Sequence, residues 1–175
     1  MSLSPADFWR GNARLRDITP KGERFPEAGL FDALRRTCRG SVFEFGCGDG
    51  RLAPAFPADG YAGFDINPAA LAAAARANPG YSFGNTWQPG DTWLAWTVLL
   101  HVPDDEIAPL LSRTADYGRV VIGEVMGRRW RRPGDPPVFN RESHEYVELV
   151  GRELIDVFAV PYPRYACDLI VLVFE

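Results

Sequence analysis

Short apolar runs alternate along the chain with segments in which apolar residues recur at helical spacing. Short runs bounded by glycine, proline, asparagine or aspartate are typical of strands. On this pattern we expect strands at residues 42–45, 61–64, 81–83, 91–98, 119–125, 153–160 and 166–174.

Helical patterns occupy several of the segments between these runs. Asn67 can cap a helix whose first position is Pro68, and the alanine-rich segment 69–77 continues this helix to a stop signal at 78–80. Apolar residues at helical spacing predict a helix over residues 104–116. Further helices are expected over residues 8–14, after Arg51, and over residues 140–151 with Asn140 as the cap.

The most specific pattern is a set of three glycines directly after the first expected strand. Gly46, Gly48 and Gly50 are spaced two apart, and glycines at such a turn let a ligand approach the backbone closely. Asp65 ends the second expected strand, where a carboxylate can accept both hydroxyls of a ribose. Together these residues predict a site for a ligand built on adenosine.

Two other nucleotide sites do not fit the residues. A dinucleotide fingerprint requires a small third residue where this chain has Arg51. A phosphate-binding P-loop requires Gly-Lys-Ser/Thr, and the only lysine of the chain is Lys21.

The segment Glu44-Phe45-Gly46-Cys47-Gly48-Asp49-Gly50, followed by Asp65, resembles motif I of the class I S-adenosylmethionine-dependent methyltransferases. The resemblance extends over residues 40–175. It implies an α/β fold, with a Rossmann-like, seven-stranded, mostly parallel sheet, helices on both faces and an antiparallel last strand. We therefore expect one domain over residues 1–175, with an N-terminal helical lid at 1–39 and the Rossmann-like core at 40–175.

The same resemblance implies which residues bind S-adenosyl-L-methionine. The loop around its methionine half comprises Glu44, Gly46, Cys47, Gly48 and Gly50. Asp65 would hold the ribose, and Ile66 would either cover the adenine or pack in the core.

Two further segments are expected to contact this cofactor. Asn85 would receive the adenine amino group, or its neighbours Thr86 and Trp87 would do so through backbone or stacking, although the family more often has an aspartate there. Trp9 or Arg14 would reach the cofactor carboxylate if the N-terminal segment folds over as a lid. The alternative for that segment is a helix packed on the sheet.

Candidate residues for the transfer follow later strands. His101 is expected at the end of the fourth strand, either as a general base near pH 7 or as a packed residue that shapes the pocket. Glu124 is a candidate for substrate contact, and His144 is either a surface residue or a second such contact. Arg128 begins a run of four arginines within five residues, which would clamp an anionic substrate, contact RNA or remain solvated.

Composition narrows the setting. The chain is 46% hydrophobic and 24% charged, as in ordinary globular proteins, and its net charge of −4 argues against a nucleic-acid face. No apolar run approaches the roughly 20 residues that span a membrane. The three cysteines show neither disulfide nor metal-ligand spacing, so we expect no metal and a cytoplasmic, reducing location.

The sequence thus predicts an S-adenosylmethionine-dependent methyltransferase that acts on the oxygen or nitrogen of a small molecule by direct transfer. The chain has no motif of the DNA methyltransferases, so no DNA partner is expected. One alternative is a non-catalytic S-adenosylmethionine-binding sensor or partner subunit. Another is an RNA or protein methyltransferase that uses the arginine run. The sequence leaves the oligomeric state open.

Overall fold

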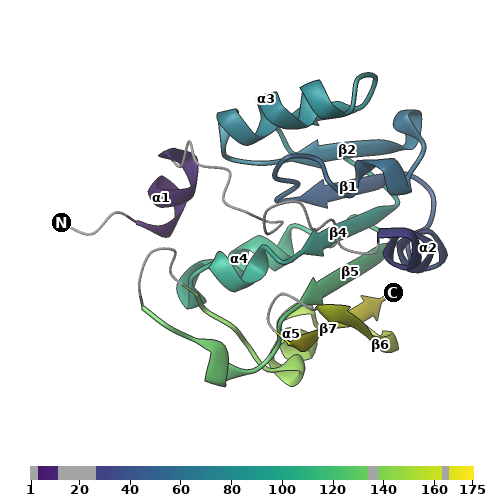
Figure 1. Cartoon of the computed structure of the whole chain (residues 1–175). Helices are drawn as coiled ribbons and strands as arrows, with labels where there is room; N and C mark the ends of the chain where they lie inside the picture. Colours follow the sequence, from purple (N-terminus) through teal and green to yellow (C-terminus); the bar gives the residue numbers. More distant parts are fainter. Residues whose placement is uncertain (1–3, 12–26, 134–137, 163–165) are drawn as a thin grey trace.

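The fold is built on one seven-stranded sheet with the strand order β3-β2-β1-β4-β5-β7-β6 (Figure 1). It is known from a computed structural model that describes residues 4–11, 27–133, 138–162 and 166–175. The strands are β1 (Val42–Phe45), β2 (Tyr61–Phe64), β3 (Ser82–Gly84), β4 (Thr92–Trp96), β5 (Arg119–Glu124), β6 (Leu154–Tyr162) and β7 (Cys167–Phe174).

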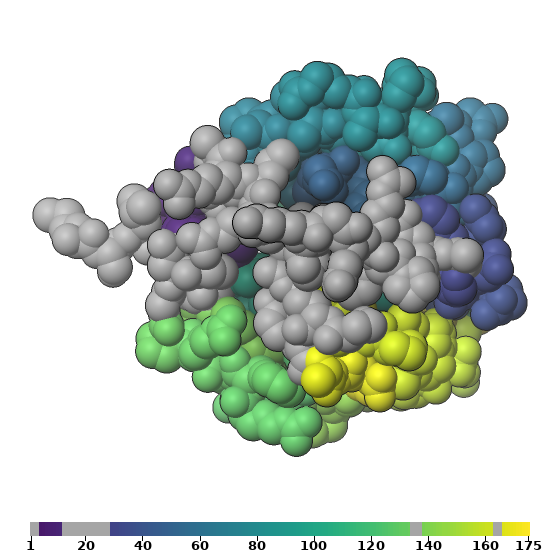
Figure 2. Space-filling model, in the orientation of Figure 1, coloured from purple at the N-terminus to yellow at the C-terminus, as the bar shows by residue number. Residues whose placement is uncertain are grey.

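The first five strands pair in parallel, and β7 is antiparallel to both β5 and β6. The strand order therefore reverses between β1 and β4, which are adjacent in the sheet although β2 and β3 lie between them in the sequence. The fold class expected from the sequence, including the antiparallel last strand, is confirmed. In the space-filling view, the region of α3 and the last two strands lie at opposite sides of the molecule (Figure 2).

The α-helices are α1 (Pro5–Gly11), α2 (Glu27–Thr37), α3 (Pro68–Ala77), α4 (Asp104–Ser112) and α5 (Ser143–Val150). Helices from α2 onward cover both faces of this sheet (Figure 1). On one face, Leu34 of α2 packs in a core with Leu94 and Val121 of the central strands. On the other face, Leu111 of α4 and Tyr146 of α5 pack in a second core. Most of the sheet is thereby buried on both sides, as parallel sheets require.

Aromatic side chains take the place of a helix on one part of the second face. β3 and β4 are joined by a short connection without a helix, and Trp87 of this connection packs on Phe43 and Phe45 at ring-centroid distances of 5.0 and 5.8 Å. The guanidinium of Arg113 lies 3.8 Å from the centroid of the Trp87 ring. This arrangement is a cation–π contact that covers the strands where no helix passes.

Some predicted elements differ from the structure. No α-helix follows Arg51: two 3-10 turns, η1 (Ala53–Ala55) and η2 (Ala58–Gly60), stand there, because Pro54 and Pro57 each lack the amide that a longer helix needs. α5 begins at Ser143 rather than near Asn140. Its cap is Glu142, whose side chain accepts from the amide of Glu145 in a capping box.

The predicted lid also divides into two parts. α1 lies beyond the carboxyl ends of the parallel strands, whereas α2 lies near their opposite ends (Figure 1). Leu34 of α2 is 1% exposed, so this helix belongs to the core layer. Within the part of the chain that the structure describes, no helix is both long and apolar enough to cross a bilayer.

Candidate functional site

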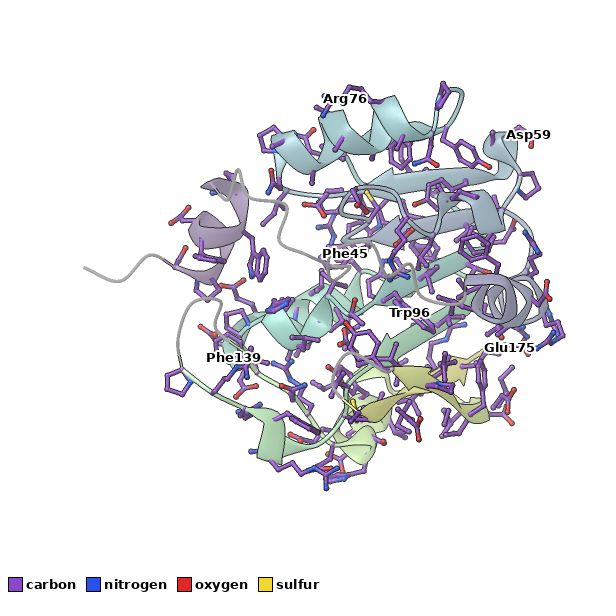
Figure 3. All side chains as sticks on the ribbon, viewed as in Figure 1. Phe45, Asp59, Arg76, Trp96, Phe139 and Glu175 are labelled. Carbon is purple, nitrogen blue, oxygen red and sulfur yellow. The ribbon has the colours of Figure 1, made fainter. Side chains whose placement is uncertain are left out.

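A cavity of about 650 Å³ opens at the carboxyl ends of β1, β2 and β4, where the strand order reverses. Open α/β sheets bind ligands at this place. Phe45 at the end of β1 and Trp96 at the end of β4 both line the cavity and are labelled in Figure 3. Its volume lies within the range of about 300–1,000 Å³ that is usual for small-molecule sites.

The glycine loop forms one wall. The amides of Gly46 and Cys47 both donate to the carbonyl of Phe64, at 2.8 and 2.9 Å, so the loop continues the pairing of β1 with β2. Gly46 has a φ of +74°, and a Cβ at this position would lie 2.2 Å from a methyl carbon of Val98. Any side chain at this position would strain the backbone and overlap Val98, so glycine lets the loop pass over the segment after β4.

Asp65 joins the second strand to this loop. Its carboxylate accepts hydrogen bonds from the amide of Gly48 at 2.9 Å and from the amide of Asn67 at 2.8 Å. Burial raises the pKa of Asp65, and these two backbone hydrogen bonds oppose the rise. Each carboxylate oxygen can accept a second hydrogen bond. Asp65 lines the cavity and has this capacity for a ligand hydroxyl.

Glu44 supports the loop from within the sheet. It is 3% exposed, and its carboxyl group accepts a hydrogen bond of 2.5 Å from the hydroxyl of Tyr61. Burial raises the pKa of Glu44 to about 7, although the Tyr61 hydroxyl works in the opposite direction. Glu44 borders the cavity, so its carboxyl group is both a structural anchor and a part of the wall.

His101 and Trp9 meet at the cavity wall. His101 ends the 3-10 turn η3 (Leu99–His101), which follows β4, and Trp9 belongs to α1. Their ring centroids are 4.3 Å apart with an interplanar angle of 52°. Both residues line the cavity, so α1 lies against the segment that carries the predicted base.

Glu124 lies beneath this segment and does not line the cavity. It is 1% exposed, and its carboxylate accepts from the amides of Val98 and Leu99 at 2.8 and 2.6 Å. Burial raises the pKa of Glu124 to about 8, and hydrogen bonds from the η3 backbone oppose the rise. Glu124, predicted as a substrate contact, is therefore placed under η3 and bonds to the backbone there.

Two arginines of the run form ion pairs with acidic side chains. Arg128 pairs with Glu145 of α5 and does not line the cavity, and Arg131 makes two hydrogen bonds to Asp104, at 2.7 and 2.6 Å. Arg132 does line the cavity, together with Trp130. The residue of this run that reaches the site is therefore Arg132, which the sequence pattern did not distinguish from its neighbours.

The remaining predicted site residues are divided. Ile66, Cys47 and Gly48 line the cavity. Gly50 does not, and a Cβ there would lie 2.8 Å from the side chain of Asn78, so it serves the packing of the loop on α3. Residues that are exposed and away from the cavity are Asn85, Thr86 and His144. Arg14 lies outside the described residues.

Three buried polar atoms of lining residues lack a hydrogen-bond partner among the described residues. They are two acceptors, Oδ1 of Asp49 and Oδ1 of Asn140, and one donor, Nε1 of Trp9. Buried polar groups are normally paired, so such atoms point to a ligand of matching polarity. An acceptor and a donor on one cavity suit the ammonium and carboxylate groups of an amino acid.

Comparison with known proteins places the fold. No family model matches the chain, and no curated protein sequence shows significant similarity to it. Solved structures do match. Magnesium protoporphyrin IX methyltransferase from Synechocystis, with S-adenosylmethionine bound, has a TM-score of 0.72 at 14% identity, with 98% of this chain and 97% of that chain covered.

Two further structures agree. A TehB-like S-adenosylmethionine-dependent methyltransferase from Corynebacterium glutamicum has a TM-score of 0.63 at 21% identity, covering 87% of this chain and 88% of its own. The 1,6-didemethyltoxoflavin-N1-methyltransferase of Burkholderia thailandensis, bound to S-adenosylhomocysteine, has a TM-score of 0.61 at 20% identity, covering 96% and 80%. The fold of this chain is therefore that of the class I S-adenosylmethionine-dependent methyltransferases.

Proposed function

We propose that this protein is an S-adenosylmethionine-dependent methyltransferase that transfers a methyl group to an oxygen or nitrogen of a small molecule. The observation that carries the proposal is the meeting of the glycine loop and Asp65 on one cavity at the reversal of strand order. These are the residues that the sequence resemblance singles out.

The cavity favours this cofactor over a dinucleotide. In dinucleotide sites the pyrophosphate rests on the N-terminus of the α-helix that follows the glycine loop. Here the short 3-10 turn η1 follows the loop, and the side chain of Arg51 lines the cavity. S-adenosylmethionine has no phosphate and needs no helix N-terminus.

The lining residues match each part of this cofactor. Asp65 would accept the ribose hydroxyls, and Ile66 with Val98 offers an apolar wall for the adenine. Asp49 and Trp9 would pair their unpartnered atoms with the ammonium and carboxylate groups of the methionine end.

The residues around His101 would orient the acceptor. When bound, S-adenosylmethionine supplies a methyl group on a positively charged sulfur, which is already electrophilic. The protein then has to align the acceptor atom and exclude water. Trp9 and His101 form a contact that closes one side of the cavity, and a neutral imidazole at His101 would take the acceptor proton near neutral pH.

A small acceptor fits the surroundings of the cavity better than a nucleic acid. Two similar structures are named for small-molecule acceptors, a protoporphyrin and a toxoflavin precursor. In this chain Arg128 and Arg131 are paired with acidic side chains, which lowers the positive charge that the loop could offer to RNA. Arg132 and Trp130 line the cavity, and we assign them to contact with the methyl acceptor.

Binding and transfer are tested separately. Calorimetry should show binding of S-adenosylmethionine and S-adenosylhomocysteine but not of a nicotinamide dinucleotide. Transfer of labelled methyl to pools of metabolites, RNA and protein should then label the metabolite pool. Binding without transfer to any pool would favour the sensor or partner-subunit alternative, and tight binding of the dinucleotide alone would overturn the proposal.

The role of His101 is tested by His101→Gln. We expect turnover to fall, by about 10²–10⁴-fold if the imidazole is the general base. The affinity for S-adenosylhomocysteine should be retained. A loss well below that range, with an unchanged pH profile, would assign His101 to positioning. His144→Gln is the matched control, because His144 is exposed and away from the cavity.

A further inference from the structure

The 3-10 turn η3 is attached to the protein through its backbone on two sides. On the amide side, one carboxylate oxygen of Glu124 accepts hydrogen bonds from the amides of both Val98 and Leu99. Glu124 is the last residue of β5, a buried central strand, so its side chain starts from a rigid position.

On the carbonyl side, Arg141 holds the same turn. Its guanidinium donates to the carbonyl of Leu99 at 3.1 Å and to the carbonyl of Val102 at 2.8 Å. The amide of the nearby Phe139 donates to the carbonyl of Leu100 at 2.6 Å. The turn that ends in His101 is thus held at its amides from β5 and at its carbonyls from the segment before α5.

Both side chains are almost completely buried, at 1% exposure for Glu124 and 2% for Arg141. Buried polar and charged groups are costly to desolvate, and apolar residues of similar volume often stabilise a core as well or better. Most hydrogen bonds of these two side chains are made to the backbone of η3 and the residues next to it. Their arrangement is explained if the exact position of that turn matters.

We propose that Glu124 and Arg141 form a clamp, the η3 clamp, that positions His101 against Trp9 and toward the methyl acceptor. The functional part of this inference rests on the proposed function, while the positional part stands on the η3 geometry alone. Glu124 and Arg141 are positioning residues, because their contacts are with the η3 backbone. A displacement of about 1 Å near a reacting centre can lower the rate by about 10²-fold.

The chain offers a matched control for Arg141. Arg131 also bonds to Asp104, as Arg141 does, but its remaining hydrogen bond goes to the carbonyl of Asn140 and not to η3. Arg131→Met and Arg141→Met therefore both remove an arginine from Asp104, and only Arg141→Met releases the η3 backbone.

The position of His101 can be read without the cofactor. The chain has two histidines, so NMR of the imidazole Hε1 protons gives two signals, which His144→Gln assigns. The Trp9 ring, 4.3 Å from the His101 ring, should displace the His101 signal by its ring current. We expect this displacement to shrink in Arg141→Met and in Glu124→Leu, and to persist in Arg131→Met and in Glu124→Gln, which retains an acceptor oxygen.

Turnover gives the second readout. In Arg141→Met we expect kcat to fall at least tenfold with S-adenosylhomocysteine affinity and KM nearly unchanged, and in Arg131→Met no such loss. If Arg141→Met does not fold, Arg141→Lys decides, because it keeps the charge beside Asp104 but cannot reach both carbonyls. An unmoved His101 signal in the folded variant would overturn the clamp. Failure of the wild-type protein to bind S-adenosylhomocysteine would instead refute the proposed function and leave the NMR result standing.

Discussion

The backbone amide of Gly48 donates a 2.9 Å hydrogen bond to the carboxylate of Asp65. This bond joins the glycine loop after β1 to the end of β2, so the two parts of the sequence motif form one structural unit. The Asp65 carboxylate therefore helps to position the glycine loop, and a ligand that bonds to Asp65 lies beside this loop. The motif residues therefore depend on one another for their function.

The first prediction follows from this relationship. Asp65→Ala should lower the affinity for S-adenosylhomocysteine at least tenfold, because each hydrogen bond to a charged group contributes about 1.5–3 kcal/mol. Calorimetry measures the affinity. Asp59→Ala is the control, since Asp59 is an exposed carboxylate before the opposite end of β2 (Figure 3). An unchanged affinity in a folded Asp65→Ala protein would place the ribose elsewhere.

Local patterns account for the parts of the fold that the sequence predicted. β2 lies at the expected residues, and Asn67 caps α3 by accepting from the amides of Ala69 and Ala70, because these features depend on neighbours in the chain. The prediction of a helix after Arg51 was wrong. The prolines of that segment lack the amides that a continuous helix needs, although a helix commonly follows a glycine turn of this kind.

Contacts between distant residues explain what the sequence did not predict. Arg128 and Arg132 have the same charge and lie in the same run. Arg128 forms an ion pair with Glu145 of α5, whereas Arg132 lines the cavity. Glu124 was expected to contact substrate because it ends a strand. The amides that it binds belong to η3, and their position depends on how β4 ends rather than on any local pattern.

The second prediction concerns the close approach of Gly46 and Val98. Gly46→Ala should lower the free energy of unfolding by about 1–3 kcal/mol, because it combines a left-handed φ with an overlap of the new methyl group and Val98. Gly84→Ala is the control, since a Cβ there has no described atom within 4 Å. Urea unfolding measures both variants.

A double variant separates the two causes. Adding Val98→Ala to Gly46→Ala removes the overlap and leaves the backbone strain, so part of the stability should return relative to Val98→Ala alone. If the second substitution gives no relief, the overlap is not the source of the loss.

The third prediction is a pH dependence of stability caused by Glu44. Its folded pKa of about 7 lies above the ordinary value of 4.5, so the folded state holds a proton that the unfolded state loses first. The free energy of unfolding should therefore fall as the pH rises from about 4.5 to about 7, by on the order of 3 kcal/mol from this residue. Glu124 acts in the same direction, over a range that extends to about 8.

Glu44→Gln tests this sign. The variant has no proton to lose, so its stability should decline less steeply between pH 5 and pH 7 than that of the wild type, as measured by urea unfolding at each pH. Equal slopes for the two proteins would show that Glu44 titrates normally in the folded state.

The fourth prediction compares two arginines of one loop. If Arg132 contacts the acceptor, Arg132→Gln should raise the KM for an acceptor that carries a carboxylate or phosphate, with a smaller effect on kcat. Arg128→Gln removes the same charge from the same loop, but Arg128 is paired with Glu145 and lies away from the cavity, so its KM should stay close to the wild-type value. Steady-state kinetics with a charged acceptor and a neutral analogue measure both effects.

Because Arg132 is exposed, the effect of Arg132→Gln on KM should weaken as salt increases. An equal rise in KM for both variants would indicate a general field of the loop rather than a contact, and no rise for Arg132→Gln would remove this loop from acceptor recognition.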